Sequence, residues 1–231
     1  MIRSITTLTL CLAAVTAQGA LLGRAALTPG GTDYQAYYDN ALDITWLADA
    51  SFAQTSGFDS DGLLLWGDAQ AWMADLSTAA HLGATNWRQP IVRPVDGSSF
   101  DLSFSFNGST DIGHNISASG SAFPGSTGSE LAHLFYTTLG NISPFNVGRV
   151  FVGCPNPGPL LCLDNTGPFS NVQVSYMTGT DDPVNANSFL AFNFYNGAQY
   201  STGTKNFLGY AWAVRDGDIA LVPAPAAVWL F

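Results

Sequence analysis

Apolar residues recur at helical spacing in two stretches of the chain. Between Trp66 and Ala80 they follow one another at steps of three and four, which places them on one side of a helix that Gly83 can end. In the second stretch Ser129 is a candidate N-terminal cap, and Glu130 suits the positive end of the helix that begins there. The face of this second helix consists of Leu131, Leu134, Phe135, Thr138 and Leu139. The pattern therefore predicts two helices.

Four other runs alternate apolar and polar residues, which is the period of a half-buried strand. They lie at residues 42–46, 100–106, 172–176 and 210–214. Helices inserted among mainly antiparallel strands indicate an α+β fold rather than alternating βαβ units. The Ser- and Gly-rich stretch 108–128 is expected to be a long excursion over the surface. No repeat or domain boundary is visible, and the length suits one domain or at most two small ones.

The first residues have the pattern of a secretory signal. One positive charge at Arg3 is followed by the uncharged, largely apolar stretch 5–15 and by small residues up to Ala20 that offer cleavage sites. The alternative is an N-terminal anchor helix, but about 11 residues are too few to cross a bilayer, which takes roughly 20. We therefore expect residues 1–20 to be a signal peptide and the mature protein to be exported.

Charge narrows the range of partners. The net charge is −10, and charged residues make up only 10% of the chain. This balance argues against nucleic acid as a partner, because little would neutralise the phosphates. It also disfavours direct binding to anionic lipids or sulfated glycans. The few cations, Arg88 and Arg215 among them, are expected to pair with carboxylates at the edge of the core.

Two cysteines remain after removal of the signal, which contains Cys11. Cys154 and Cys162 flank a Pro- and Gly-rich turn, and an even pair in an oxidising compartment predicts a disulfide that closes a small loop. A metal site is the alternative, but two thiols without a nearby histidine fall short of the usual four ligands. We expect the disulfide.

A series of sequence blocks resembles a known family. In order along the chain, the blocks lie at 39–50, 57–62, 66–72, 86–90, 129–136, 165–169 and 210–217. They are similar to the Lcl C-terminal domain family, a domain of unknown function in exported bacterial proteins, in the variety that carries a PEP-CTERM sorting tail. The resemblance assigns residues 21–221 to the domain and 222–231 to a truncated tail. Gln89 departs from the family, which usually has Leu there, and the Val-Pro-Ala-Pro motif beginning at Val222 lacks the Glu of the tail's name.

The resemblance carries expectations for fold and function. It implies a C-type-lectin-like architecture with two helices, mainly antiparallel sheets, long loops and a first strand paired with the last. The family's adhesin relatives imply a non-catalytic surface or matrix protein that binds extracellular polysaccharide or surface glycans. Exosortase is the implied partner if the tail is complete, and release from the cell is implied if the chain stops at Phe231. A structural envelope protein without a ligand is the alternative.

Evidence for catalysis or metal binding is slight. The chain lacks the nucleophile-elbow, dinucleotide and zinc-protease motifs, so we expect no enzyme. A glycoside hydrolase is the least favoured alternative, and its carboxylate pair could be Asp101 with Glu130 or Asp181 with Asp182. The histidines are expected to be surface or structural residues: His81, His114 and His133, the last pointing outward.

The turn at Asp59 and Asp61 has the Asp-x-Asp-Gly form used by some Ca²⁺ sites, so Ca²⁺ is the one candidate cofactor. The same residues form turns without any ion. The aromatic residues divide into two groups. The tryptophans at periodic positions are expected in the core: Trp46, Trp66, Trp72, Trp87 and Trp212. Phe194, Tyr195 and Tyr200 are expected to be exposed and are the candidate glycan contacts.

Overall fold

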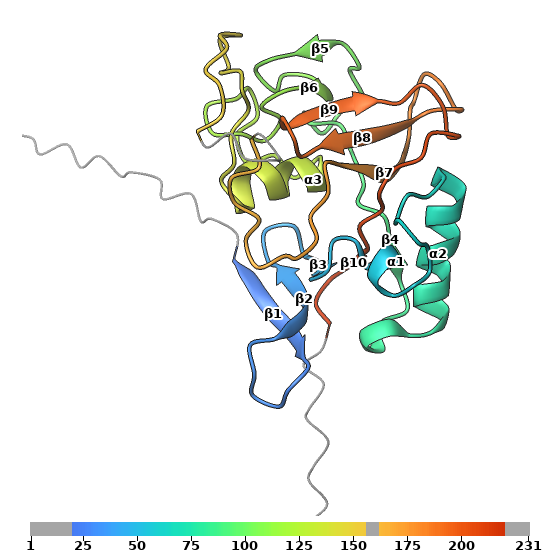
Figure 1. Ribbon diagram of the computed structural model, residues 1–231. Coiled ribbons are helices and arrows are strands. Elements are labelled where there is room, and N and C mark those ends of the chain that lie inside the picture. Colours follow the sequence, from blue (N-terminus) through green and yellow to red (C-terminus); the bar gives the residue numbers. More distant parts are fainter. Residues whose placement is uncertain (1–19, 156–161, 220–231) are drawn as a thin grey trace, which may run out of the picture.

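The computed structural model describes residues 20–155 and 162–219 and contains two five-stranded sheets with few helices, which confirms the predicted α+β class. The first sheet has the order β1 (Leu21–Ala26), β2 (Tyr34–Asp39), β3 (Ile44–Leu47), β10 (Val214–Asp216) and β4 (Trp87–Arg88). The second has the order β5 (Phe104–Ser105), β6 (Ile112–Gly113), β9 (Ala198–Ser201), β8 (Phe189–Asn193) and β7 (Ser175–Asp181). Figure 1 shows the first sheet below the second.

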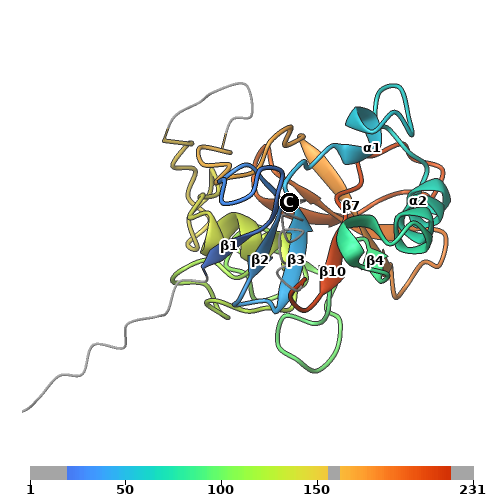
Figure 2. The same ribbon diagram turned by 90° about the horizontal axis from the view of Figure 1, so that it is seen from below.

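The first sheet joins the two ends of the described chain. β10 pairs antiparallel with β3 on one side, where Val214 lies opposite Trp46, and with β4 on the other, where Val214 lies opposite Arg88. Seen from below, the five strands succeed one another across the view (Figure 2). β10, the last strand in the described part of the chain, is thus an interior strand of a sheet whose other strands come from the first part of the sequence.

Both predicted helices are present, and the structure adds a third, short helix that the sequence pattern did not predict. Helix α2 (Trp66–Thr78) ends just before Ala80, whose φ is 47°. Helix α3 (Glu130–His133) begins at Ser129, whose Oγ accepts a hydrogen bond from the backbone N of Ala132 at 3.3 Å. A π-helical turn (Leu134–Thr138) continues α3. The single-turn α1 (Phe52–Thr55) is too short to produce a periodic pattern.

The strands near the centre are buried on both faces. One core cluster surrounds α3 and contains Trp46, Phe135 and Trp212; the other lies against α2 and contains Leu47 and Met73. The prediction that β3 is half-buried is therefore wrong: all four of its residues are buried. Its one polar residue, Thr45, is accommodated because its hydroxyl donates to the backbone O of Gly217 at 2.8 Å.

The other predicted strands are displaced or shortened. Of the run 100–106, only Phe104–Ser105 forms a strand, and Phe104 is 56% exposed because its ring contacts other rings, including that of His114, rather than the core. The run 172–176 begins as a strand only at Ser175, and the run 210–214 reaches regular pairing only at Val214.

The stretch 108–128 is only in part the surface excursion that its composition suggested, because most of residues 110–118 are buried whereas most of residues 119–128 are exposed or half-buried. Ile116 is 1% exposed, and its polar neighbours are buried because they satisfy backbone groups of other segments. The Asn115 side chain donates to the backbone O of Phe106 at 2.7 Å and of Phe145 at 2.8 Å. The Asp111 carboxylate accepts from the backbone N of Val95 at 2.7 Å. These side chains take over the hydrogen bonding that sheet partners would otherwise supply.

Within the two described ranges, no helix is long and apolar enough to cross a membrane. The expected signal peptide, apart from Ala20, and the expected sorting tail at 222–231 lie outside the described residues.

Candidate binding groove

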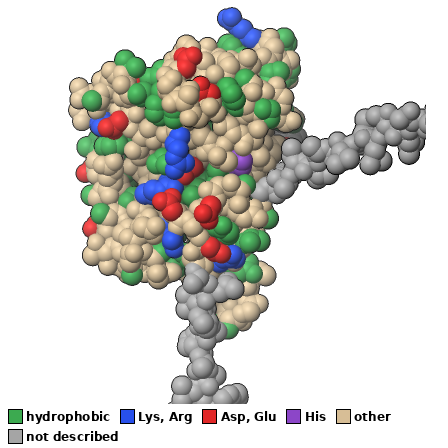
Figure 3. All heavy atoms as spheres, turned by 180° about the vertical axis from the view of Figure 1, so that it is seen from behind, with side chains coloured by type: hydrophobic (Ala, Val, Ile, Leu, Met, Phe, Trp, Pro, Cys, Tyr) green, Lys and Arg blue, Asp and Glu red, His purple; other side chains and the backbone are tan. Residues whose placement is uncertain are grey.

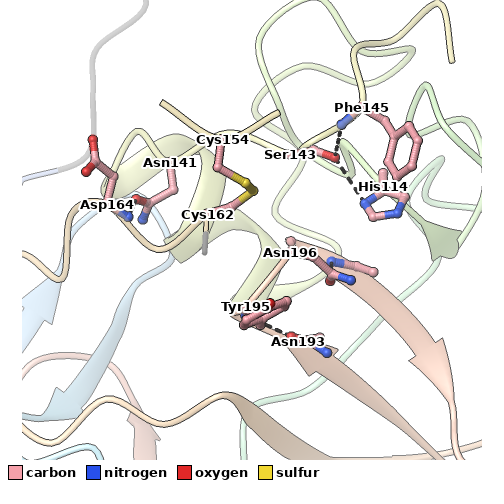
Figure 4. The surroundings of a disulfide bond; sticks show 12 residues. His114, Asn141, Ser143, Phe145, Cys154, Cys162, Asp164, Asn193, Tyr195 and Asn196 are labelled. Atoms are coloured by element: carbon pink, nitrogen blue, oxygen red, sulfur yellow. Dashed lines mark hydrogen bonds between the residues drawn. A yellow bond between two sulfur atoms is a disulfide. The ribbon is translucent and has the colours of Figure 1, made fainter. Parts of the chain in front are cut away.

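The predicted disulfide is present. Cys154 and Cys162 are bonded with their Cα atoms 4.9 Å apart. Cys162 is fully buried, and its backbone N donates to the backbone O of Tyr195 at 2.9 Å. Figure 4 shows the disulfide beside the turn that connects β8 and β9, where Tyr195 lies. The bond therefore fastens the segment around Cys154 to the core next to this turn.

The three candidate glycan contacts differ in exposure. Phe194 is 0% exposed, so the expectation that it contacts a ligand at the surface is wrong. Its backbone N donates to Val174 O at 2.8 Å, which extends the pairing of β8 with β7, and its ring lies 5.4 Å from that of Tyr176 inside the core. Tyr195 is 39% exposed beside the disulfide. Tyr200 is half-buried in β9.

Tyr200 lines a groove on the second sheet. On the floor, Met177, Ala191 and Tyr200 lie opposite one another on β7, β8 and β9. The cavity has a volume of about 120 Å³. We call it the Tyr200 groove; its lining includes Leu63, Val174, Ser175, Met177, Tyr200, Phe207 and Tyr210.

The rim of the groove exposes large apolar side chains. Phe207 is 59% exposed, Leu208 is 51% exposed and Val174 is 42% exposed. The segment that carries Phe207 and Leu208 is fixed at its next residue, because Gly209 and Leu64 exchange two backbone hydrogen bonds of 3.0 Å. An exposed apolar rim around a formed cavity is typical of a surface that makes contact with something else.

The polar groups in the groove are hydroxyls. Tyr200 Oη lies 2.7 Å from Ser175 Oγ, and the Ser175 hydroxyl also donates to Phe192 O at 3.2 Å. Tyr176 Oη accepts from the backbone N of Gln173 at 2.7 Å, and burial raises the pKa of Tyr176 well above its ordinary value, so this phenol stays neutral. Among the described residues that line the groove, none is charged. The groove therefore combines aromatic and aliphatic surface with neutral hydrogen-bonding groups.

Asp59 and Asp61 lie in a turn whose backbone N–H groups donate hydrogen bonds to their side chains. Asp59 Oδ1 accepts from the backbone N of Asp61 at 3.0 Å and of Gly62 at 2.8 Å, and these two bonds lower the pKa of Asp59. Asp61 Oδ1 accepts from the backbone N of Leu63 at 2.9 Å. Such hydrogen bonds from backbone N–H groups to an Asp side chain define an Asx-turn. Within residues 20–155 and 162–219, no three His, Cys, Asp or Glu side chains gather as a metal site.

The carboxylates considered for a hydrolase have other partners. Glu130 is 2% exposed and binds the Arg88 guanidinium through both oxygens. Asp101 accepts from the Ser103 hydroxyl at 2.6 Å. Asp181 forms an ion pair with Lys205 at 2.7 Å. Asp182 Oδ1 accepts from the backbone N atoms of Val184 and Asn185. Each carboxylate thus already has a structural role.

Two of the histidines are more deeply placed than expected. His133, expected to point outward, is 3% exposed, because its Nδ1 lies 3.1 Å from Ser126 O and its backbone belongs to the buried helix α3. His114 is 5% exposed and stacks on Phe106, with ring centroids 5.7 Å apart. His81 is half-buried just beyond α2. These are structural positions.

Four of the five tryptophans expected in the core are buried there: Trp46, Trp72, Trp87 and Trp212. The fifth, Trp66, is half-buried and donates from Nε1 to Thr178 O at 2.8 Å. The Nζ atom of Lys205 lies 4.0 Å from the centroid of the Trp66 ring.

The arginines pair as expected only in part. Arg88 binds the carboxylates of Glu130 and Asp216, as predicted. Arg215 instead donates to the backbone O of Asp218 at 3.3 Å. Acidic and basic side chains are interspersed on the face shown in Figure 3, without an extended basic patch.

Comparison of the chain with family models, curated proteins and solved structures finds no match.

Proposed function

We propose that this protein is a non-catalytic, exported surface or matrix protein that binds uncharged glycan through the Tyr200 groove. The observation that carries the proposal is the combination in this groove of aromatic rings, exposed apolar rims and hydroxyl groups. Sugar rings have apolar faces that stack on aromatic side chains, and their own hydroxyls match neutral donors and acceptors. The tyrosine that lines the groove, Tyr200, is also one of the candidates indicated by the sequence.

Charge favours a neutral glycan over an anionic one. The groove lining contains no Lys or Arg among the described residues, and the chain has a net charge of −10. A sulfated or uronate-rich polymer would be repelled by this field and would find no cation to pair with. A neutral polysaccharide has neither disadvantage.

The finer fold assignment belongs to the same proposal. A C-type-lectin-like architecture is supported by the pairing of the early strand β3 with the late strand β10, by helices α2 and α3, and by the long connections between strands. The motifs of the Lcl C-terminal domain family support it as well. Binding in the Tyr200 groove requires no metal, so a Ca²⁺-dependent mode of glycan binding is not part of the proposal.

Location outside the cell is supported by two independent features. The N-terminal residues have the pattern of a signal peptide, and the Cys154–Cys162 disulfide is the kind of bond that persists in oxidising compartments. We propose extracellular polysaccharide as the partner, and exosortase as a second partner if the sorting tail continues.

A glycan array probed with the purified protein tests the proposal, with Tyr200→Ala as the loss variant. We expect the wild type to bind neutral glycans and Tyr200→Ala to bind at least about tenfold more weakly, the size of one lost aromatic contact. Phe151→Ala is the matched control, because Phe151 is an exposed aromatic residue outside the groove, at 69% exposure. Equal binding by the two variants would show that the glycan-binding site lies outside the Tyr200 groove. The absence of glycan binding by the wild type would favour a structural envelope protein without a ligand.

A further inference from the structure

A second cavity, separate from the Tyr200 groove, lies between the β1–β2 hairpin, α1 and the turn that follows α2. Its volume is about 210 Å³. We call it the Asp49 pocket; the residues that matter for its chemistry are Tyr34, Asp49, Phe52, His81 and Ser170. It is smaller than the roughly 300–1,000 Å³ of most drug-sized sites, so it suits a compact group.

Asp49 is held firmly at this pocket. Its Oδ1 accepts from the backbone N of Ser51 at 2.9 Å, and its Oδ2 accepts from the Thr55 hydroxyl at 2.6 Å. The backbone on either side is fixed too, because Ala50 N donates to Ser170 O and Ser170 N donates to Ala48 O, each at 2.9 Å. The carboxylate therefore needs little rearrangement to receive a ligand.

Among the residues that the structure describes, no cationic side chain neutralises the charge of Asp49. No Lys or Arg lines the pocket, and none of the ion pairs found among residues 20–155 and 162–219 includes Asp49. An ionised carboxylate offers about four acceptor positions, of which the contacts to Ser51 and Thr55 use two. Two positions remain for donors that come from outside the chain.

The walls of the pocket are aromatic. The rings of Phe52 and His81 lie against each other with centroids 4.9 Å apart. Burial lowers the pKa of His81, so its imidazole is neutral at neutral pH and adds no positive charge. A third ring, that of Tyr34, has the space it needs because residue 23 is glycine: a Cβ there would lie 2.1 Å from the Tyr34 ring.

We propose that the Asp49 pocket binds an organic ammonium group. Aromatic faces attract a cation through their quadrupole, and a neighbouring unpaired carboxylate supplies the counter-charge. The net charge of −10 raises the local concentration of cations at the surface. A neutral ligand of the same shape would gain from neither effect. The shared chemistry covers a methylated ammonium such as choline and the primary ammonium of an amino sugar.

Isothermal titration with matched pairs of small molecules tests this inference. Choline is compared with 3,3-dimethylbutan-1-ol, its uncharged isostere, and glucosamine with glucose. We expect at least one charged ligand to bind about tenfold more tightly than its neutral counterpart. Tighter binding of choline identifies a methylated ammonium, and tighter binding of glucosamine identifies an amino sugar. Equal affinity within both pairs, or no binding of either charged ligand at millimolar concentration, would overturn the inference.

Variants assign the effect to the pocket. Asp49→Asn keeps the shape of the side chain and is expected to lose the preference for the charged ligand, about tenfold. Asp75→Asn removes the same charge from an exposed position on α2 and should leave binding unchanged. Phe52→Leu keeps an apolar wall but removes a ring, and it should weaken only the charged ligand. If Asp75→Asn weakens binding as much as Asp49→Asn, general surface charge accounts for the affinity and the inference fails.

Discussion

Arg88 binds the carboxylate of Glu130 through two parallel hydrogen bonds, from Nη1 to Oε2 at 2.8 Å and from Nη2 to Oε1 at 2.7 Å. The same carboxylate accepts from the backbone N of Ile91 at 2.8 Å, and the same guanidinium reaches Asp216 on β10. Because Arg88 belongs to β4 and Glu130 begins α3, this pair ties the first sheet to the helix packed between the sheets (Figure 1). Paired charges this deeply placed are costly to separate.

We expect Glu130→Gln to lower the free energy of unfolding by about 1.5–3 kcal/mol, because the half-buried Arg88 loses its charged hydrogen-bond partner in the core and keeps only Asp216. Urea unfolding followed by circular dichroism measures the change. Asp181→Asn is the control: the side chains of Asp181 and Lys205 are 54% and 26% exposed in their pair, and surface pairs contribute about 0–1 kcal/mol. Equal losses in the two variants would show that the Arg88–Glu130 pair is no stronger than an exposed one.

Removal of the disulfide should cost stability. The double variant Cys154→Ser, Cys162→Ser is expected to unfold with about 2–4 kcal/mol less free energy than the oxidised wild type, because the unfolded chain regains the freedom of its open loop. The comparison is made with and without reductant. Wild type should fall to the level of the double variant in reductant, whereas the variant should not respond. A wild type insensitive to reductant would contradict the expectation.

Stability should fall in mild acid, in part through His114. Burial lowers the pKa of this imidazole below its ordinary value near 6.5, so the unfolded state binds more protons than the folded state as the pH drops through that value. The stabilisation is therefore complete above about pH 6.5 and is lost as the pH falls toward the folded-state pKa. The loss is roughly 1.4 kcal/mol for each pH unit that separates the unfolded-state pKa of His114 from its folded-state pKa. His114→Phe keeps a ring among Phe104, Phe106 and Phe145 but cannot titrate.

Urea unfolding at pH 7.5 and pH 5 measures this contribution. The difference between the two conditions should be smaller in His114→Phe than in the wild type. His81 is half-buried with its pKa lowered in the same way, so His81→Phe should remove a separate part of the difference. An unchanged difference in His114→Phe would contradict the assignment to that residue.

Gln89→Leu should stabilise the protein. Gln89 is 2% exposed, and neither its side-chain oxygen nor its nitrogen finds a hydrogen-bond partner within residues 20–155 and 162–219. An unsatisfied buried amide costs about 1–3 kcal/mol, so a leucine of similar size should recover a gain of that order. Gln89→Ala is the comparison, because it removes the polar group but leaves a cavity. Equal destabilisation by Leu and Ala would refute the expectation.

The features that depend on neighbours in sequence were predictable. Helices α2 and α3 follow from the spacing of their own apolar residues, and the Ser129 cap follows from its residue type. The disulfide follows from the two cysteines and their turn.

The features that depend on contacts between segments distant in the sequence were not predictable. The polar Thr45 suggested an exposed face, but β3 is covered on both sides, and only the tertiary fold supplies Gly217 as its partner. Likewise Phe194 packs in the core cluster around α3 while Tyr200 is half-buried and lines the groove, and only the tertiary fold decides which of the two is covered. The Tyr200 groove itself combines segments far apart in sequence, because Leu63, Val174 and Phe207 all line it.

The interior position of β10 has a consequence for the order in which the chain can fold. β3 and β4 are joined through a common strand only after residues 214–216 have been synthesised, and these lie far along the sequence from both strands. Pairing across such a distance closes a long loop and is slow. The first sheet therefore cannot be completed before the segment that contains β10 is present, whereas the pairing of β7, β8 and β9 in the second sheet does not depend on it.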